Sequence, residues 1–166
     1  PFLFVQIAGW AHGEPAPYES AWAELREAQL MTLSLPQTAM VVTTDISDPK
    51  DIHPKNKQEV GRRLSLTARS IVYGQKIECS GPMYQSMKVE GDKIRLHFTH
   101  ADGGLKVRDG GTLKGFGIAG VDQKFVDAEA VIDGQAVVVH SDKVANPVAV
   151  RYGWADVPEF GLVNDA

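Results

Sequence analysis

The first part of the chain alternates between short apolar runs and stretches with helical periodicity. Phe2–Ala8 and Ala39–Thr44 are apolar runs, the second rich in valine and threonine, and both predict strands buried on two faces. Between them, Ser20–Leu33 is typical of a helix, with Ser20 as its N-cap and Pro36 past its end. Together with a further helix after the second run, this order predicts a parallel α/β sheet.

That further helix is predicted between Pro54 and Gly74. Proline suits the first position of a helix, and glycine ends one. Four apolar residues spaced by four, four and three form one stripe along it: Val60, Leu64, Ala68 and Ile71. His53 then falls near the N-cap, where the positive end of the helix dipole disfavours the imidazolium form and leaves the ring able to accept a proton.

From about Cys79 onward the helical period is lost. Turn signals built on Asp-Gly and Gly-Gly separate short segments in which apolar and polar residues alternate. The segments predicted as strands are Met87–Val89, Lys93–Phe98, Phe125–Ile132, Ala136–His140 and Val148–Tyr152. Asp133 and Gly134 predict a tight hairpin between two of them. The strands indicate a small antiparallel β-sandwich, with the boundary to the α/β part at Ser80-Gly81-Pro82.

Composition narrows the classes of function. Of the 166 residues, 43% are hydrophobic and 23% are charged, as in a soluble globular protein. No apolar run approaches the roughly 18–20 residues of a membrane-spanning helix, and the N-terminus lacks the pattern of a signal peptide. A net charge of −4 argues against nucleic acid as a partner. The single cysteine, Cys79, cannot form an internal disulfide or a zinc cluster, and no metal site is expected.

Candidate chemistry gathers where the two predicted parallel strands end. Ligands of such sheets bind beyond the carboxyl ends of the strands, which places Trp10 and His12 on the same rim as the Asp45–His53 segment. A carboxylate beside an imidazole, here Asp51 and His53, is the arrangement of a general base with the group that orients it. The alternative is that the two residues cap a helix and line a turn. Trp10 offers a face on which a sugar can stack, or is an ordinary loop tryptophan.

The segment Asp51–Leu64 reads DIHPKNKQEVGRRL and resembles the last block of the SGNH-type esterases, specifically the sialate O-acetylesterase-like carbohydrate esterases. In that family a similar string carries the catalytic histidine. Three further segments agree with the family: Pro1–Ala8, Leu25–Gln29 and Tyr152–Pro158. The resemblance implies that residues 1–79 are the C-terminal part of an SGNH-hydrolase parallel α/β sandwich, and that residues 80–166 are an accessory β-sandwich domain.

The resemblance also implies an activity. The protein would be a serine-type esterase that removes O-acetyl groups from carbohydrates such as sialate, xylan or other glycans, with His53 as general base and no cofactor. Its compartment would be the periplasm or the exterior of the cell. The family aspartate lies three residues before the histidine, where this chain has Lys50. The orienting group is therefore left open among Asp51, as first choice, Asp48, Asp45, a backbone carbonyl and a group outside the chain.

The family's nucleophile lies in an N-terminal Gly-Gln-Ser-Asn-like block, and its oxyanion donors are a glycine and an asparagine of two later blocks. None of the three blocks is found in this sequence, and the chain opens at Pro1 directly in an apolar run, so we interpret it as a fragment. An N-terminal polypeptide segment with the serine and the oxyanion donors is the expected partner, beside an acetylated carbohydrate substrate. One rival hypothesis is a non-catalytic carbohydrate-binding module with an inactive α/β scaffold. The other, a lipid esterase, fits poorly with the polar segment Asp45–Asn56.

Overall fold

The computed structural model describes residues 1–11, 18–159 and 161–165, and its fold is mixed α/β with several sheets and few helices. The chain forms two compact units. One comprises Pro1–Ser80 together with Ala155–Pro158, and the other comprises Gly81–Trp154 together with Glu159–Ala166. The first long segment of this unit ends at Ser80, within the predicted boundary Ser80-Gly81-Pro82, but the unit also contains a short segment from near the C-terminus. The assignment of residues 1–79 and 80–166 to two functional domains stays a prediction.

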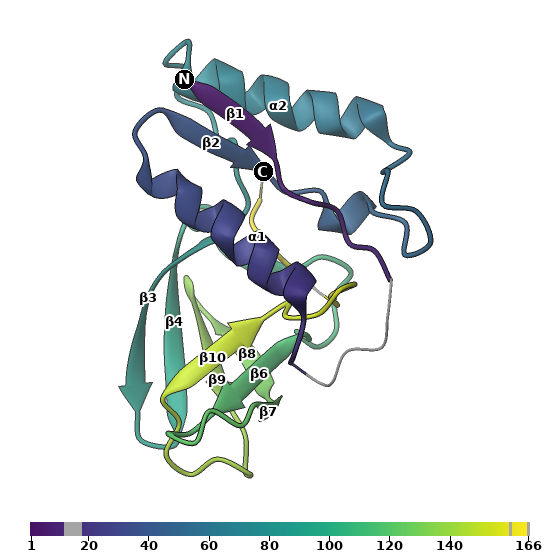
Figure 1. Ribbon diagram of the computed structural model, residues 1–166. Helices are drawn as coiled ribbons and strands as arrows, with labels where there is room; N and C mark the ends of the chain where they lie inside the picture. Colours follow the sequence, from purple (N-terminus) through teal and green to yellow (C-terminus); the bar gives the residue numbers. More distant parts are fainter. Residues whose placement is uncertain (12–17, 160, 166) are drawn as a thin grey trace. The chain divides into compact units, whose positions relative to one another are not determined.

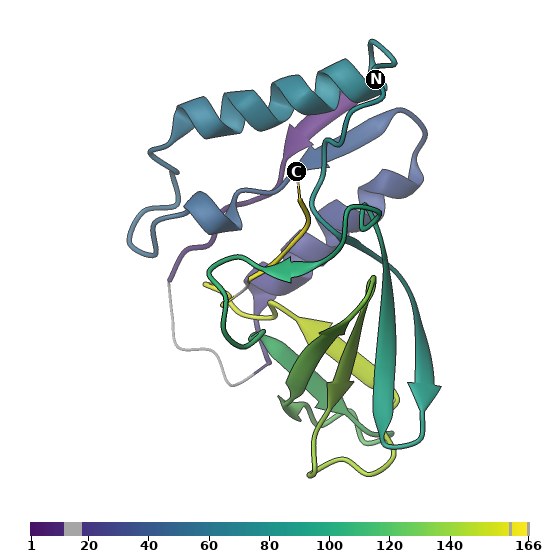
Figure 2. The ribbon, with the colours of Figure 1, turned by 180° about the vertical axis from the view of Figure 1, so that it is seen from behind.

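The first unit is built on two parallel strands. Strand β1 (Phe2–Val5) pairs along its whole length with β2 (Thr38–Val41). Helix α1 (Ala21–Met31) connects the two strands, helix α2 (Lys57–Ile71) follows β2, and Figures 1 and 2 show the helices on opposite faces of the pair. The short 3-10 helices are η1 (Thr32–Ser34) and η2 (Thr44–Ile46). The predicted order of elements and the parallel pairing are confirmed. In the described part of the chain, no helix is long and apolar enough to cross a lipid bilayer.

Strand β1 is shorter and more exposed than the sequence suggests. Phe2 is 63% exposed and Val5 is 37% exposed, so the prediction of a strand buried on both faces is wrong for the described chain. The reason is that β1 pairs only with β2 among the described residues, which leaves its other edge uncovered. Beyond Val5 the backbone still follows β2, because the Gln6 N–H donates to the Val41 carbonyl at 2.8 Å.

A buried polar network fixes α1 to the rest of the first unit. Ser20 caps the helix by accepting from the Ala23 N–H at 3.0 Å, as predicted, and its hydroxyl donates to Asp156 at 2.6 Å. Arg26 donates to the Ala155 carbonyl. Burial lowers the pKa of Arg26, and the charge of Asp156 opposes this shift. Arg26 is thus a structural residue that holds Ala155–Pro158 against α1.

Helix α2 begins three residues later than predicted. Its N-cap is Asn56, whose side-chain oxygen accepts from the Glu59 N–H at 3.1 Å, and Pro54 lies in the preceding loop. An asparagine amide caps a helix better than a histidine can, which explains the shift of the boundary. His53 therefore stands three residues before the N-cap. Because the helix dipole acts within about one turn, the predicted effect of the dipole on His53 is not supported.

The end of α2 lies near the predicted stop. The helix ends at Ile71, and Gly74 adopts a positive φ of 65° while its N–H donates to the Ser70 carbonyl at 3.1 Å. The predicted apolar stripe is only partly covered. Val60, Leu64 and Ala68 are half-buried, Ile71 is 45% exposed, and the buried residue of the helix is Thr67.

The second unit consists of antiparallel sheets. The largest has the order β3-β4-β9-β8, with β3 (Met83–Glu90), β4 (Lys93–Thr99), β8 (Glu129–Asp133) and β9 (Ala136–His140). The next has the order β10-β6-β7, with β6 (Phe116–Ala119), β7 (Val126–Asp127) and β10 (Ala149–Tyr152). A third pairs β5 (Lys106–Val107) with β11 (Leu162–Val163). Figure 2 shows the hairpins β3–β4 and β8–β9 side by side.

Both larger sheets contribute to one core. Its buried members are Ile94, Leu96, Leu113, Phe116, Ile118, Val137 and Val139. The hairpin predicted at Asp133-Gly134 is confirmed, because Asp133 pairs with Ala136 across a two-residue turn in which Gly134 has a φ of 63°. The predicted single strand Phe125–Ile132 is instead two strands. The backbone leaves β6 at Ala128 and continues in the other sheet as β8.

Gly115 offers a strong test of this unit. Its φ is +83°, and a Cβ there would lie only 2.1 Å from the carbonyl oxygen of Glu159. We expect Gly115→Ala to lower the free energy of unfolding by about 3 kcal/mol or more, because both the strained backbone and the clash must be relieved. Gly110 is the matched control, since it has a φ of +74° and nothing within 4 Å, so Gly110→Ala is expected to cost only about 1–2 kcal/mol. Urea unfolding of both variants, in the protein that carries this chain together with its expected serine-bearing part, measures the difference, and equal losses would contradict the close approach.

Candidate active site

Two loops of the first unit meet beyond the carboxyl ends of β1 and β2. The Ala11 N–H donates to the Pro49 carbonyl at 2.9 Å, which joins the loop after β1 to the loop after β2. The two loops also approach closely at Gly9, where a Cβ, if present, would lie 3.0 Å from the Ser47 hydroxyl oxygen. The structure therefore brings together the loops of Trp10 and of Asp45–His53, as the rule for parallel sheets predicts.

Asp51 and His53 are in direct contact. The Nδ1 atom of His53 lies 3.0 Å from Oδ1 of Asp51, and the backbone N–H of His53 donates to the same oxygen at 2.9 Å. An ionised carboxylate can only accept, so Nδ1 carries a hydrogen, and in the neutral form of the ring Nε2 is the nitrogen with the lone pair. The imidazole is 79% exposed, with Nε2 on the edge opposite Asp51. This is the arrangement of a general base whose ring is oriented by a carboxylate.

His53, whose ring Asp51 orients, in turn stabilises the ionised form of the Asp51 carboxylate. The backbone N–H of His53, followed by its ring, holds the pKa of Asp51 below its ordinary value. Among the residues that the structure describes, His53 makes its side-chain hydrogen bond to Asp51 alone. A proton acceptor with one oriented nitrogen and one exposed nitrogen can abstract a proton from a group brought to it from outside this loop.

The other two carboxylates considered as orienters are engaged elsewhere. Asp48 accepts from the Lys50 N–H at 3.0 Å and from the Lys55 ammonium at 3.1 Å, and these contacts lower the pKa of Asp48. Asp45 forms a two-pronged ion pair with Arg63, with both N–O distances at 2.6 Å. Of the three candidates, only Asp51 contacts the imidazole. That it is the catalytic orienter stays a prediction.

Trp10 is half-buried and packs against a second tryptophan. Its ring centroid lies 5.7 Å from that of Trp22 at an interplanar angle of 59°, and the indole N–H of Trp22 donates to the Ala8 carbonyl at 2.7 Å. The backbone N–H of Trp10 donates to the Asp156 carbonyl at 3.3 Å. Its proposed role in stacking on a sugar remains a prediction, and His12 lies outside the described residues.

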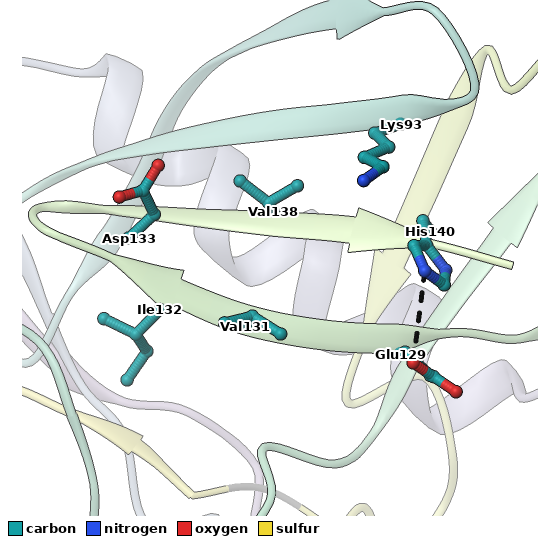
Figure 3. Close-up of a pocket in the computed structure, with 7 residues that line it drawn as sticks. All are labelled: Lys93, Glu129, Val131, Ile132, Asp133, Val138 and His140. Carbon is teal, nitrogen blue, oxygen red and sulfur yellow. Dashed lines mark ion pairs between the residues drawn. The ribbon is translucent and has the colours of Figure 1, made fainter.

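A hollow of about 370 Å³ lies in the second unit, over strands β4, β8 and β9 (Figure 3). It is lined by Lys93, Glu129, Val131, Ile132, Asp133, Val138 and His140. Both of its carboxylates have a basic neighbour, because Glu129 lies 4.0 Å from His140 and Asp133 lies 2.7 Å from Arg95. The hollow holds no residue of the predicted site. Across the described ranges of both units, no group of three or more His, Cys, Asp and Glu residues could hold a metal ion.

No family model matches the chain. The sialate O-acetylesterase of Mus musculus is 26% identical over 170 residues, which cover 95% of this chain and 31% of that protein. The Homo sapiens sialate O-acetylesterase is 35% identical over 71 residues, which cover 40% of this chain and 14% of that protein. A crystal structure of a carbohydrate acetylesterase from Xanthomonas citri matches with a TM-score of 0.94 at 48% identity, over 99% of this chain and 38% of that chain.

These similarities define the class of proteins to which the chain is related, the carbohydrate esterases. Among these proteins the chain is similar to the sialate O-acetylesterases, so the resemblance predicted from the sequence is confirmed. The chain spans about a third of the length of the relatives it matches.

Proposed function

We propose that this chain is part of a serine-type carbohydrate O-acetylesterase and that it supplies the catalytic histidine, His53. The observation that carries the proposal is the 3.0 Å contact between His53 and Asp51 in a loop beyond the end of a parallel strand. The 48% identity to a carbohydrate acetylesterase of known structure supports it. The substrate would be an acetylated sialate, xylan or another acetylated glycan.

In the proposed reaction, His53 moves protons in two half-reactions. The Nε2 atom takes the proton of a serine hydroxyl as the serine oxygen attacks the acetyl carbonyl, and the proton then passes to the departing sugar oxygen. This step leaves an acetyl-serine and a free sugar hydroxyl. His53 next takes a proton from water, whose oxygen attacks the acetyl carbon, and returns it to the serine as acetate leaves. Asp51 orients the ring and stabilises its charged form, and no step needs a cofactor.

The serine and the oxyanion donors are proposed to come from an N-terminal polypeptide segment. In this proposal, residues 1–79 complete the parallel sheet of an SGNH hydrolase and residues 80–166 form its accessory β-sandwich. Exposed apolar side chains on and beside the two-stranded sheet support an additional covering: Phe2 at 63%, Val5 at 37% and Val42 at 44% exposure. A secreted or periplasmic location belongs to the same proposal and rests on the family resemblance.

Asp51→Asn tests the proposal through acetate release from acetylated sugars, measured on the protein that carries this chain together with its serine-bearing part. We expect kcat to fall about 10- to 100-fold, because the amide cannot stabilise a charged imidazole. The expected loss is smaller than for a fully buried aspartate, since the Asp51 side chain is 44% exposed. The matched control is Asp48→Asn in the same loop, which should stay within about threefold of the parent. A larger loss for Asp48→Asn than for Asp51→Asn would show that the orienter is wrongly chosen.

A further inference from the structure

Arg63 joins three parts of the first unit through one guanidinium group. Its Nη1 and Nη2 atoms each donate to a different oxygen of Asp45 at 2.6 Å. The same Nη1 donates to the Val42 carbonyl at 2.8 Å, and Nε donates to Glu59 at 2.7 Å. Three of these four hydrogen bonds connect α2 with η2 and with the backbone just beyond β2, and the fourth, to Glu59, stays within α2. Arg63 was not predicted as a functional residue, and its only signal in the sequence was a charge opposite to that of Asp45.

The residues that make these contacts lie directly before and directly after the loop that carries His53. Asp45 lies in η2, directly before the loop, and Arg63 and Glu59 lie in the first two turns of α2, directly after it. His53 is near the middle of the connecting residues 47–56. Within the loop, Lys55 is paired with Asp48 and the Asp51 N–H donates to the Asp48 carbonyl at 3.0 Å. Contacts of Asp48 therefore stabilise the conformation inside the loop. Arg63 holds the start of the loop, at η2, against its end, at α2.

The ion pair between Arg63 and Asp45, called the tie below, is well suited to hold the ends of this loop in one geometry. The Asp45 side chain is only 8% exposed and that of Arg63 is 23% exposed, so the pair is less screened by solvent than a surface pair. A planar guanidinium that donates along two parallel bonds fixes direction as well as distance, which an ammonium cannot do. Hydrogen bonds from Arg62 and Arg63 lower the pKa of Glu59 to about 2, so the third partner stays ionised at any pH at which an esterase would work.

We propose that Arg63 is a positioning residue for His53, which it places by holding Asp45 and the end of β2 against α2. Arg63 does not touch the imidazole and takes no part in proton transfer. The inference rests on the proposed function of His53. Since displacements of about 1 Å at a catalytic group can slow a reaction about 100-fold, loss of the tie should reduce turnover more than substrate affinity.

The test measures kcat, KM and the melting temperature of the protein that carries this chain with its serine-bearing part. We expect Arg63→Met to lower kcat at least about 30-fold with KM within about twofold, and Arg63→Lys to recover part of that loss. The matched control is Arg62→Met in the same turn, whose side chain is 59% exposed and bonded to Glu59, and it should stay within about twofold of the parent.

The double variant Asp45→Asn with Arg63→Met separates positioning from stability. It leaves no unpaired charge, so its melting temperature should recover relative to Arg63→Met, whereas kcat should stay low because the two-pronged tie is still absent. Recovery of kcat together with the melting temperature would overturn the proposal. If Arg63→Met does not fold, Arg63→Lys and the double variant decide the question in the same way. His53→Ala is the reference: if it stays active, the proposed function fails, and if it is inactive while Arg63→Met is not, only the positioning role fails.

Discussion

Replacing His53 with alanine is expected to lower the turnover of acetyl esters by three orders of magnitude or more. The physical reason is that the serine hydroxyl is a poor nucleophile until a base removes its proton, and in the described parts of the loops beyond β1 and β2 His53 is the only imidazole. In those described segments, Asp51 and His53 are the carboxylate and the imidazole that contact each other. Loss of one member of such a set typically removes most of the acceleration that the set provides.

The measurement is acetate release by the protein that carries this chain together with its serine-bearing part. His100→Ala is a suitable control, because His100 lies in the second unit and takes no part in the proposed chemistry. Its kcat should stay within about twofold of the parent. Activity of His53→Ala within tenfold of the parent would remove the basis for calling His53 the base.

The second prediction with a large effect concerns the activity and the stability of this chain when it is produced alone. Residues 1–166 expressed alone are expected to show no turnover of an acetyl-ester reporter above the rate in buffer. They are also expected to associate or to unfold without a sharp transition. Two parallel strands are few for a sheet of this type, and exposed apolar residues at β1 are the kind that a larger sheet covers. The serine and the oxyanion donors of the proposed mechanism would be absent from this sample.

Size-exclusion chromatography, thermal unfolding and the reporter assay test this expectation on one preparation. Adding the proposed serine-bearing N-terminal part, by fusion or as a second polypeptide, should restore a monodisperse species and measurable turnover. A large apolar interface resembling a divided core is expected between the two parts. A cooperatively melting monomer of residues 1–166 that hydrolyses the reporter through His53 would refute the expectation.

Local sequence signals predicted much of the fold. Ser20 caps α1, Gly134 forms the predicted hairpin, and the two apolar runs pair in parallel. Each of these features depends on residues that are neighbours in the chain or on a general rule of connection. Strand β6 was not predicted, because its sequence FGIA is short, contains a glycine and is buried on both faces, so no alternation marks it.

Features that depend on contacts distant in sequence were not predicted. Nothing local shows that Phe125–Ile132 changes sheets at Ala128, since both strands read as one continuous run. The start of α2 was misplaced because the prediction took Pro54 as the first helical residue and overlooked Asn56, which is a better N-cap than His53. At the site, the adjacency of Asp51 and His53 followed from their spacing, whereas the tie from Arg63 to Asp45 spans 18 residues and needs the fold.

Chemical rescue tests the central claim, that His53 is the general base, most directly. The His53 ring is 79% exposed, so its removal leaves a position that imidazole from solution can reach. Added imidazole is predicted to raise the turnover of His53→Ala in a saturable manner, with little effect on the parent protein or on Asp48→Asn. An imidazole response of His53→Ala no larger than that of the parent would contradict the claim.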